Sequence, residues 1–242
     1  MKIILLAAGL GSRLGPLTSE IPKATINVVS QPLIQRVIKF VEQIGATDII
    51  VVGGHNSQHL WKVIENSDVT KVDNPNYRKG NLYSLEAAEK YLDQDFIIMN
   101  IDHLYPTHLA RMIGETKEGV WAVADFDRPL YPDDMKIRVK GLLNKDACVS
   151  AISKELDEYD GGYCGITVVR GKSRGLYMAA YENVLRHGRD QAVVEDILAE
   201  LIHLKQPPIV LDISGIRWIE IDTQEDLANA ERILRMKPHF LD

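Results

Sequence analysis

The chain has 242 residues, of which 28 are Lys or Arg and 34 are Asp or Glu, so its formal net charge is −6. Hydrophobic residues make up 45% and charged residues 26%, which is an ordinary globular composition and argues against a disordered chain. An acidic chain is poorly suited to binding nucleic acid over a broad surface, because such binding depends on many Lys and Arg side chains that contact phosphates. We therefore expect no nucleic-acid partner. The net charge does not exclude a local basic pocket for a phosphate ligand.

The thiol content is low, since Cys148 and Cys164 are the only cysteines of the sequence. They form no C-x-x-C pair, which excludes a structural zinc cluster. Their small number fits a reduced cytosolic protein, and a single disulfide between them is the alternative. The apolar start is too short for a signal peptide, and no apolar run approaches the ~20 residues of a membrane span. The sequence predicts a cytoplasmic protein with no membrane partner.

Apolar runs alternate with helical patterns through the first half of the chain. The predicted order is strand 2–7, helix 32–44, strand 48–52, helix 57–64, strand 69–72, helix 82–92 and strand 96–101. Continuous apolar strands joined by helices are typical of a mostly parallel sheet covered on both faces. The order is Rossmann-like, so ligands are expected at the carboxyl ends of the strands.

Short loops join the strands expected in the second half, which favours antiparallel pairing. The predicted elements are strands 120–126, 135–140, 148–153 and 163–169, helix 192–204, strands 209–213 and 216–221, and helix 225–234. The expected fold class is α/β: a Rossmann-like three-layer α/β/α architecture with a mixed, mostly parallel central sheet and a smaller antiparallel layer. No linker or repeat divides the chain, which favours a single domain over 1–242.

The densest motif follows the first predicted strand. Small residues there let backbone N–H groups approach a phosphate, and two cations add positive charge. These residues are Ala7, Ala8, Gly9, Gly11 and Ser12, with the cations Arg13 and Lys23. The spacing fits neither a Walker A loop nor a dinucleotide fingerprint, which needs a third glycine where Leu14 stands. A glycine-rich loop with two solvated cations is the alternative interpretation.

The extended stretch L-A-A-G-x-G-x-R-L-x-P-L-T, followed by P-K, resembles the signature of a known family. The family comprises the nucleotidyltransferases that activate sugar phosphates and small alcohol phosphates. In it the loop wraps the nucleoside triphosphate. The resemblance implies that Arg13 and Lys23 bind the phosphates and act in catalysis.

Two carboxylates stand at the ends of predicted strands, Asp102 after strand 96–101 and Asp222 after strand 216–221. Carboxylates at such ends open into the ligand crevice and can hold Mg²⁺. Taken alone, Asp222 is better explained as the cap of the following helix. The family, however, has one metal-binding Asp after the central strand and another in a late W-x-x-I/V-D-T-x-E-D-L segment. Residues 218–227 match that segment, so the resemblance implies that Asp102 and Asp222 hold Mg²⁺.

The choice of nucleotide rests on Asn81 and Ser84, just before and within the predicted helix 82–92. An Asn at a helix start is ordinarily a cap. The segment also resembles the N-x-x-S-L segment of the cytidylyltransferase branch, where this loop reads the pyrimidine. The resemblance implies CTP as the nucleotide, with Gly54 and Gly80 completing the pocket beside Ala8.

A second set of residues is assigned to the acceptor. Asp102-His103-Leu104-Tyr105 resembles a segment of inositol-1-phosphate cytidylyltransferases, which implies that His103 meets the acceptor; an exposed surface histidine is the alternative. M-K-x-R-V recurs in cytidylyltransferases acting on inositol phosphate and on phosphonates, although a half-solvated strand gives the same alternation. The resemblance implies a catalytic and acceptor-binding Lys136. The other residues expected to bind the acceptor are Arg138, Tyr163, Glu195 and Asp196.

Two departures from the family pattern bear on the acceptor. Tyr163 stands where inositol-phosphate enzymes often have an Asp. The aromatic residues that phosphocholine enzymes use for cation–π contacts are absent near 193–196, whereas Glu195 and Asp196 remain. The second departure weakens choline as the acceptor and leaves an amine or a polyol open.

The sequence thus predicts a Mg²⁺-dependent cytidylyltransferase that transfers CMP from CTP to a small phosphorylated alcohol or phosphonate and releases pyrophosphate. Residues 1–115 would form the nucleotide-binding half, 116–215 mostly the acceptor-binding half, and 216–242 the returning metal-binding strand and last helix. One alternative is a sugar-1-phosphate nucleotidyltransferase using UTP, GTP or dTTP, and another is a non-catalytic nucleotide-sensing domain. A homodimer is the prior expectation for its assembly.

Overall fold

A computed structural model describes residues 1–187 and 190–242. The strands are β1 (Lys2–Leu6), β2 (Asn27–Val28), β3 (Gln31–Pro32), β4 (Asp48–Gly53), β5 (Thr70–Asp73), β6 (Phe96–Asn100), β7 (His103–Leu104), β8 (Gly119–Asp125), β9 (Lys136–Lys140), β10 (Cys148–Ser153), β11 (Gly161–Arg170), β12 (Ile209–Asp212) and β13 (Ile219–Glu220). The α-helices are α1 (Leu33–Gln43), α2 (Ser57–Val63), α3 (Leu82–Ala87), α4 (Thr107–Gly114), α5 (Ser173–His187), α6 (Glu195–His203) and α7 (Gln224–Met236).

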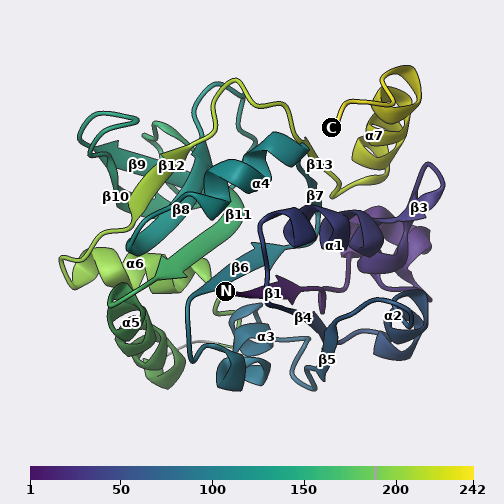
Figure 1. Ribbon diagram of the computed structural model, residues 1–242, viewed down its shortest axis with the longest axis horizontal. Helices are drawn as coiled ribbons and strands as arrows, with labels where there is room; N and C mark the ends of the chain where they lie inside the picture. The colour runs from purple at the N-terminus through teal and green to yellow at the C-terminus, as the bar shows by residue number, and fades with distance from the viewer. Residues whose placement is uncertain (188–189) are drawn as a thin grey trace.

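The central sheet runs in the order β5-β4-β1-β6-β11-β8-β12-β10-β9 (Figure 1). Strands β5, β4, β1 and β6 are parallel, and β11 then runs antiparallel to both β6 and β8. Strand β12 is parallel to β8, and β10 and β9 add an antiparallel edge. The predicted α/β class with a mixed sheet is confirmed, and the antiparallel strands extend the same sheet.

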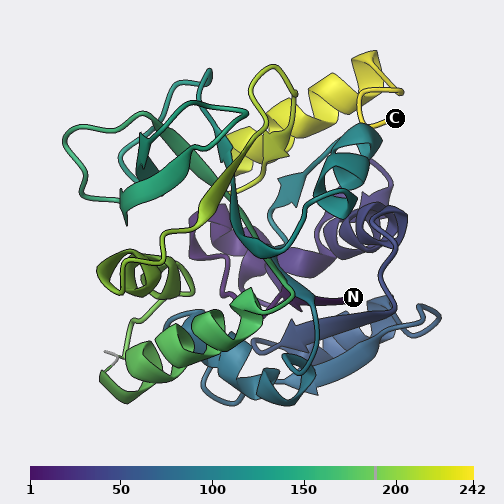
Figure 2. The same ribbon diagram turned by 60° about the vertical axis from the view of Figure 1, so that its left-hand side comes forward.

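Both faces of this sheet are covered, which explains the uninterrupted apolar runs of its strands. Along β1, Ile3 and Leu5 enter one hydrophobic core while Ile4 and Leu6 enter the other. Helices α1, α4 and α7 contribute to the first core, and α3, α5 and α6 to the second (Figures 1 and 2). Each fully buried Leu or Ile side chain stabilises such a core by about 1.5–3 kcal/mol.

Several elements differ from the sequence prediction. Helices α4 and α5 were not predicted, and the predicted helix 82–92 is split into α3 and a 3₁₀ turn over Glu89–Tyr91. The predicted helix 192–204 begins only at Glu195, because the Asp196 carboxylate accepts a hydrogen bond from the Val193 N–H at 2.9 Å. The short α4 and the shifted helix ends are places where local contacts outweigh periodicity, whereas the long α5 buries few residues and so shows little helical pattern.

A small antiparallel pair, β7 with β13, joins the middle of the chain to its last segment. His103 lies opposite Glu220 in this pair, and the Ile221 N–H donates to the Asp102 carbonyl at 2.8 Å. The pairing therefore brings Asp102 and Asp222 together, although they are 120 positions apart in the numbering.

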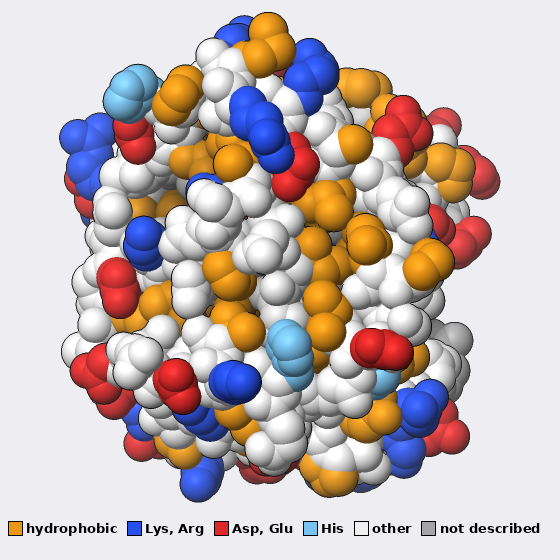
Figure 3. All heavy atoms as spheres, turned by 90° about the vertical axis from the view of Figure 1, so that its right-hand side faces the viewer, with side chains coloured by type: hydrophobic (Ala, Val, Ile, Leu, Met, Phe, Trp, Pro, Cys, Tyr) orange, Lys and Arg blue, Asp and Glu red, His pale blue; other side chains and the backbone are white. Residues whose placement is uncertain are grey.

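Figure 3 shows the face that lies over α2 and α7, with hydrophobic side chains through its middle and many charged ones toward its edge. Half-buried hydrophobic side chains from these helices, including Trp61 and Leu227, pack against the core beneath. Some of the apolar atoms on this face therefore belong to side chains that also pack against the core. Within residues 1–187 and 190–242, no helix has the length and apolar character needed to cross a membrane.

Candidate active site

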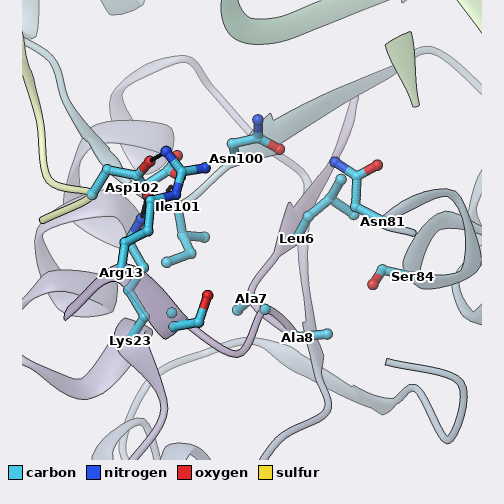
Figure 4. Close-up of a pocket in the computed structure, with 14 residues that line it drawn as sticks. Leu6, Ala7, Ala8, Arg13, Lys23, Asn81, Ser84, Asn100, Ile101 and Asp102 are labelled. Atoms are coloured by element: carbon cyan, nitrogen blue, oxygen red, sulfur yellow. Dashed lines mark hydrogen bonds and ion pairs between the residues drawn. The ribbon is translucent and has the colours of Figure 1, made fainter. Parts of the chain in front are cut away.

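A cavity of about 240 Å³ lies at the carboxyl ends of β1 and β6 (Figure 4). Most of the predicted nucleotide and metal residues line it, namely Ala7, Ala8, Gly9, Gly11, Ser12, Arg13, Lys23, Asn81, Ser84, Asp102 and Asp222. Distant parts of the chain therefore meet at the edge of the sheet where a Rossmann-like order places ligands.

The loop after β1 is shaped around Lys23. Gly11 has a φ of +62°, and a Cβ at this position would lie 2.9 Å from both the Lys23 Cβ and the Thr18 Cγ2. The Thr18 hydroxyl donates to the Gly11 carbonyl at 2.8 Å and closes the loop. Only glycine fits this left-handed, crowded position without strain.

The Lys23 ammonium lies between the two predicted metal-binding carboxylates. Its Nζ is 3.1 Å from Asp102 Oδ2 and 2.7 Å from Asp222 Oδ1, and the residue is buried. Burial alone would lower the pKa of Lys23, but the Asp102 and Asp222 charges outweigh it and raise that pKa. Lys23 is therefore held in its charged form at the centre of the cavity wall.

Arg13 supplies a second cation at the same carboxylates. Its guanidinium is 2.5 Å from Asp222 Oδ2 and 3.2 Å from Asp133 Oδ2, and its side chain is about half exposed. Arg13 thus reaches the cavity from the glycine loop while keeping contact with solvent.

Asp222 is not the cap of the helix that follows it. The N-cap of α7 is Thr223, whose hydroxyl accepts from the Asp226 N–H while the Asp226 carboxylate accepts from the Thr223 N–H. This capping box satisfies the start of the helix without Asp222. The Asp222 carboxylate is therefore available to the cavity.

His103 is buried, with 6% of its surface exposed, and does not line the cavity. Its Nδ1 is 2.9 Å from Asp102 Oδ1 and its Nε2 is 3.6 Å from Glu220 Oε1, although neither Nδ1 nor Asp102 Oδ1 makes a well-directed hydrogen bond. Burial alone would lower the pKa of His103, but the carboxylates of Asp102 and Glu220 raise it to about 10. For Asp102, Lys23 and His103 together outweigh burial and hold its pKa well below the usual range.

Asn81 and Ser84 form the opposite wall of the cavity. Asn81 stands at the N-cap position of α3 but makes no side-chain capping bond; its Oδ1 instead accepts from the Val194 N–H at 2.8 Å. The Ser84 Oγ accepts from Asn74 Nδ2 at 3.0 Å. Gly54 packs against Ala8 and Gly80 packs against residues 190–192, both outside the cavity lining.

The predicted acceptor residues lie outside the cavity lining, and their roles stay predictions. Lys136 is buried, and its Nζ donates to the Pro132 and Lys154 carbonyls at 3.0 and 2.5 Å. Arg138 pairs with Glu158.

The remaining acceptor residues lie toward the second core. The Tyr163 hydroxyl is 2.8 Å from the Thr167 hydroxyl, and Asp196 holds the start of α6. Glu195 is buried, and that burial raises its pKa to about 7. A carboxyl in this state can exchange a proton near neutral pH.

Sequence reasoning missed Leu6, Asn100 and Ile101, which also line the cavity. Leu6 and Asn100 are register partners at the carboxyl ends of β1 and β6. A polar residue at the end of an apolar strand was the available signal for Asn100.

The carboxylate pair is the part of this site that could hold a metal. Throughout the described ranges, no cluster of three or more His, Cys, Asp or Glu side chains is arranged as a metal site. Asp102 and Asp222 nevertheless face one point, which the Lys23 ammonium occupies as a cation, and Asp102 Oδ1 is buried without a hydrogen bond. Two carboxylates fit a Mg²⁺ ion whose other ligands are water and phosphate oxygens.

The chain is similar to several known proteins over nearly its whole length. The bifunctional IPC transferase and DIPP synthase of Aquifex aeolicus is 26% identical over 234 residues, which is 96% of this chain and 51% of that protein. The CMP-5'-(3-aminopropyl)phosphonate synthase of Streptomyces rubellomurinus is 25% identical over 244 residues, covering 96% of this chain and 38% of that protein. The chain spans about half the length of the first curated relatives it matches.

Among solved structures, the inositol-1-phosphate CTP transferase from T. maritima superposes with a TM-score of 0.80 at 20% identity, covering 97% of this chain and 94% of that one. At 20% identity, this superposition establishes that the two chains share a fold. Residues 3–195 match the sequence model of a protein family described as the MobA-like NTP transferase domain. The nucleotidyltransferase resemblance of the glycine loop is thereby confirmed, and the chain belongs to the MobA-like NTP transferase domain family.

Proposed function

We propose that the chain is a Mg²⁺-dependent cytidylyltransferase that transfers CMP from CTP to a small phosphorylated alcohol or phosphonate. The observation that carries the proposal is the convergence of Arg13, Lys23, Asp102 and Asp222 on one wall of a cavity whose other wall has Asn81 and Ser84. The names of the relatives and of the structural neighbour supply the class of nucleotide and acceptor.

The phosphate end of the cavity is the glycine loop. Arg13 would hold the leaving β- and γ-phosphates, and Lys23 would stabilise the charge that develops on the α-phosphate. Both cations now neutralise Asp222, so a bound polyphosphate would offer them a second set of anions.

Asp102 and Asp222 would hold Mg²⁺. The ion supplies positive charge to the phosphate oxygens during an in-line displacement. The two carboxylates would hold that charge beside the glycine loop, next to the buried Lys23 ammonium.

The base end of the cavity supports CTP. Because the Asn81 Oδ1 is used by the Val194 N–H, its Nδ2 is the group left to donate to a base. The Ser84 Oγ accepts a hydrogen bond from Asn74 Nδ2, which leaves the hydroxyl proton of Ser84 to donate to a group in the cavity. Two donors match the adjacent O2 and N3 acceptors of cytosine, whereas uracil carries a hydrogen at N3.

The acceptor would approach from the side of residues 116–215, with 1–115 binding the nucleotide and 216–242 returning Asp222 to the site within a single domain. Lys136 is proposed for the acceptor phosphate, and Arg138, Tyr163, Glu195 and Asp196 for its remaining contacts. A cytoplasmic location and a homodimer belong to the proposal, and the low cysteine content of the sequence fits a reducing setting.

The proposed chemistry is one displacement. A phosphate or phosphonate oxygen of the acceptor forms a bond to the α-phosphorus of CTP, the bond from that phosphorus to the β-phosphate oxygen breaks, and pyrophosphate leaves. No enzyme-bound intermediate is needed, because positioning and charge neutralisation suffice for phosphoryl transfer. Cys164 supports this route, since it is fully buried and burial raises its pKa well above the ordinary thiol value.

Pyrophosphate release, measured with CTP, UTP, GTP and dTTP against a panel of acceptors, tests the proposal. The panel should contain inositol 1-phosphate, aminoalkyl phosphates and phosphonates, and a sugar 1-phosphate. We expect pyrophosphate release with CTP when the acceptor is either inositol 1-phosphate or one of the aminoalkyl phosphates and phosphonates. Release only with another nucleotide and the sugar phosphate would replace the proposal by a sugar-activating enzyme, and binding without release would favour a sensing domain.

A further inference from the structure

The His103 ring sits in a niche formed on several sides. It stacks on Tyr105 at 5.7 Å with an interplanar angle of 17° and contacts Trp218 at 5.1 Å. Gly165 has a φ of +68°, and a Cβ there would lie 3.0 Å from the His103 Cε1. The ring is therefore fixed by packing, and it has no direct opening to the cavity.

Both ring nitrogens of His103 face carboxylates. Nδ1 is 2.9 Å from Asp102 Oδ1, and Nε2 is 3.6 Å from Glu220 Oε1 on the paired strand β13. Glu220 is in turn 3.7 Å from the Arg128 guanidinium, which lies 4.4 Å over the Trp218 ring. A continuous sequence of charges thus leads from Arg128 to the carboxylate at the cavity.

The two oxygens of Asp102 have different neighbours as a result. Oδ1 is turned to His103, inside the protein, while Oδ2 is turned to Lys23, on the cavity side. With Oδ1 in ion-pair contact with His103 at 2.9 Å, Asp102 presents Oδ2 in a defined direction. Contacts that support a metal ligand in this way typically change metal affinity by ~10–100-fold.

We propose that His103, braced by Glu220, is a positioning residue that holds Asp102 so that its Oδ2 points to the Mg²⁺ of the proposed reaction. This inference rests on the proposed function, and it gives His103 a role through Asp102 in place of direct contact with the acceptor.

Two substitutions at the same position separate this role from simple packing. In His103→Asn the amide nitrogen stands near the position of Nδ1 and can still contact Asp102. In His103→Gln it stands near the position of Nε2 and can reach Glu220 but not Asp102. A third variant, Glu220→Gln, removes the charge behind the ring; Glu220 does not line the cavity, and its side chain is partly exposed.

The readout is the dissociation constant of CTP, measured by calorimetry without acceptor, once with Mg²⁺ and once with a chelator. The ratio of the two constants is the magnesium enhancement. We expect His103→Asn to keep the enhancement within about 3-fold of the wild-type value, and His103→Gln to lower it by about 10-fold or more. Glu220→Gln should also lower it, and the affinity measured with the chelator should change little in all three variants.

Equal enhancement in His103→Asn and His103→Gln would overturn the proposal, as would an unchanged enhancement in Glu220→Gln. A loss of affinity that is the same with chelator and with Mg²⁺ would assign the residues to packing alone and overturn it as well. If the wild-type chain itself shows no enhancement, its magnesium site fails together with this inference. If the wild-type chain does not bind CTP, the proposed function has failed first.

Discussion

Asp102 and Asp222 are the residues on which the proposed metal chemistry depends. In the structure Lys23 contacts both carboxylates and Arg13 contacts Asp222, so these cations balance the charges of the two carboxylates and orient them. The residues that must exchange partners when a ligand enters are thus side chains, and the glycine loop and β7–β13 pair can stay in place.

Replacing Asp222 by Asn should lower kcat/KM with CTP and Mg²⁺ by at least about 100-fold, the scale expected when a stabiliser of transition-state charge is removed. The cause would be loss of one carboxylate from the metal pair. Initial rates of pyrophosphate release measure it. Asp133→Asn is the matched control, since it removes the other carboxylate paired with Arg13 but lies outside the cavity lining. Full turnover in the Asp222 variant would contradict the metal assignment.

Residues that a motif surrounds were predicted to lie together at the ligand site, and the structure brings them to one cavity, while their roles stay predictions. Arg13, Lys23 and Asp222 lie in long motifs and line the cavity, as does Ser84. Asn100 was missed because one polar residue at a strand end resembles any strand terminus. The niche around His103 could not be predicted, because it is formed by Trp218 and Glu220, which only the fold brings close.

Among the elements, α7 shows how a helix start and a functional residue divide their tasks. Its capping box uses Thr223 and Asp226, which leaves the adjacent Asp222 to the cavity. Thr223→Ala should lower the free energy of unfolding by about 1 kcal/mol, the usual cost of losing an N-cap. Urea denaturation measures this value, and Thr223→Ser, which keeps the hydroxyl, should stay near wild type. An unchanged stability in the alanine variant would show that the cap contributes nothing.

Strands were predicted more successfully than helices, and the reason lies in their burial. Strands β1, β4 and β6 are buried on both faces, so their sequences are continuous apolar runs that periodicity detects. Helix α5 was missed because only Tyr177, Ala180 and Tyr181 are buried along its 15 residues, which leaves little helical pattern. Of the small β7–β13 pair, β13 lies within the predicted strand 216–221, whereas β7 was missed because two residues carry no period.

For the whole molecule, the buried carboxyl of Glu195 should make stability depend on pH. Burial raises its pKa from 4.5 to about 7, so the folded chain binds this proton more tightly than the unfolded chain. The stabilising effect is fully present below about pH 4.5 and is lost as the pH rises through about 7. The free energy of unfolding should therefore fall between pH 5 and 8, by on the order of 1–3 kcal/mol.

Urea denaturation at pH 5 and pH 8 measures that slope, and Glu195→Gln, which has no proton to lose, should show a smaller fall over the same range. Parallel curves for the wild-type chain and the variant would mean that Glu195 has an ordinary pKa in the folded protein.

The central claim is that this cavity transfers the CMP part of CTP. Its most direct test is to supply CTP labelled with ³²P at either the α- or the γ-phosphate, together with Mg²⁺ and the acceptors of the panel. The account predicts that the α label appears in a new acceptor-linked product while the γ label appears in pyrophosphate. Release of the γ label as inorganic phosphate, or transfer of the γ label to the acceptor, would contradict it.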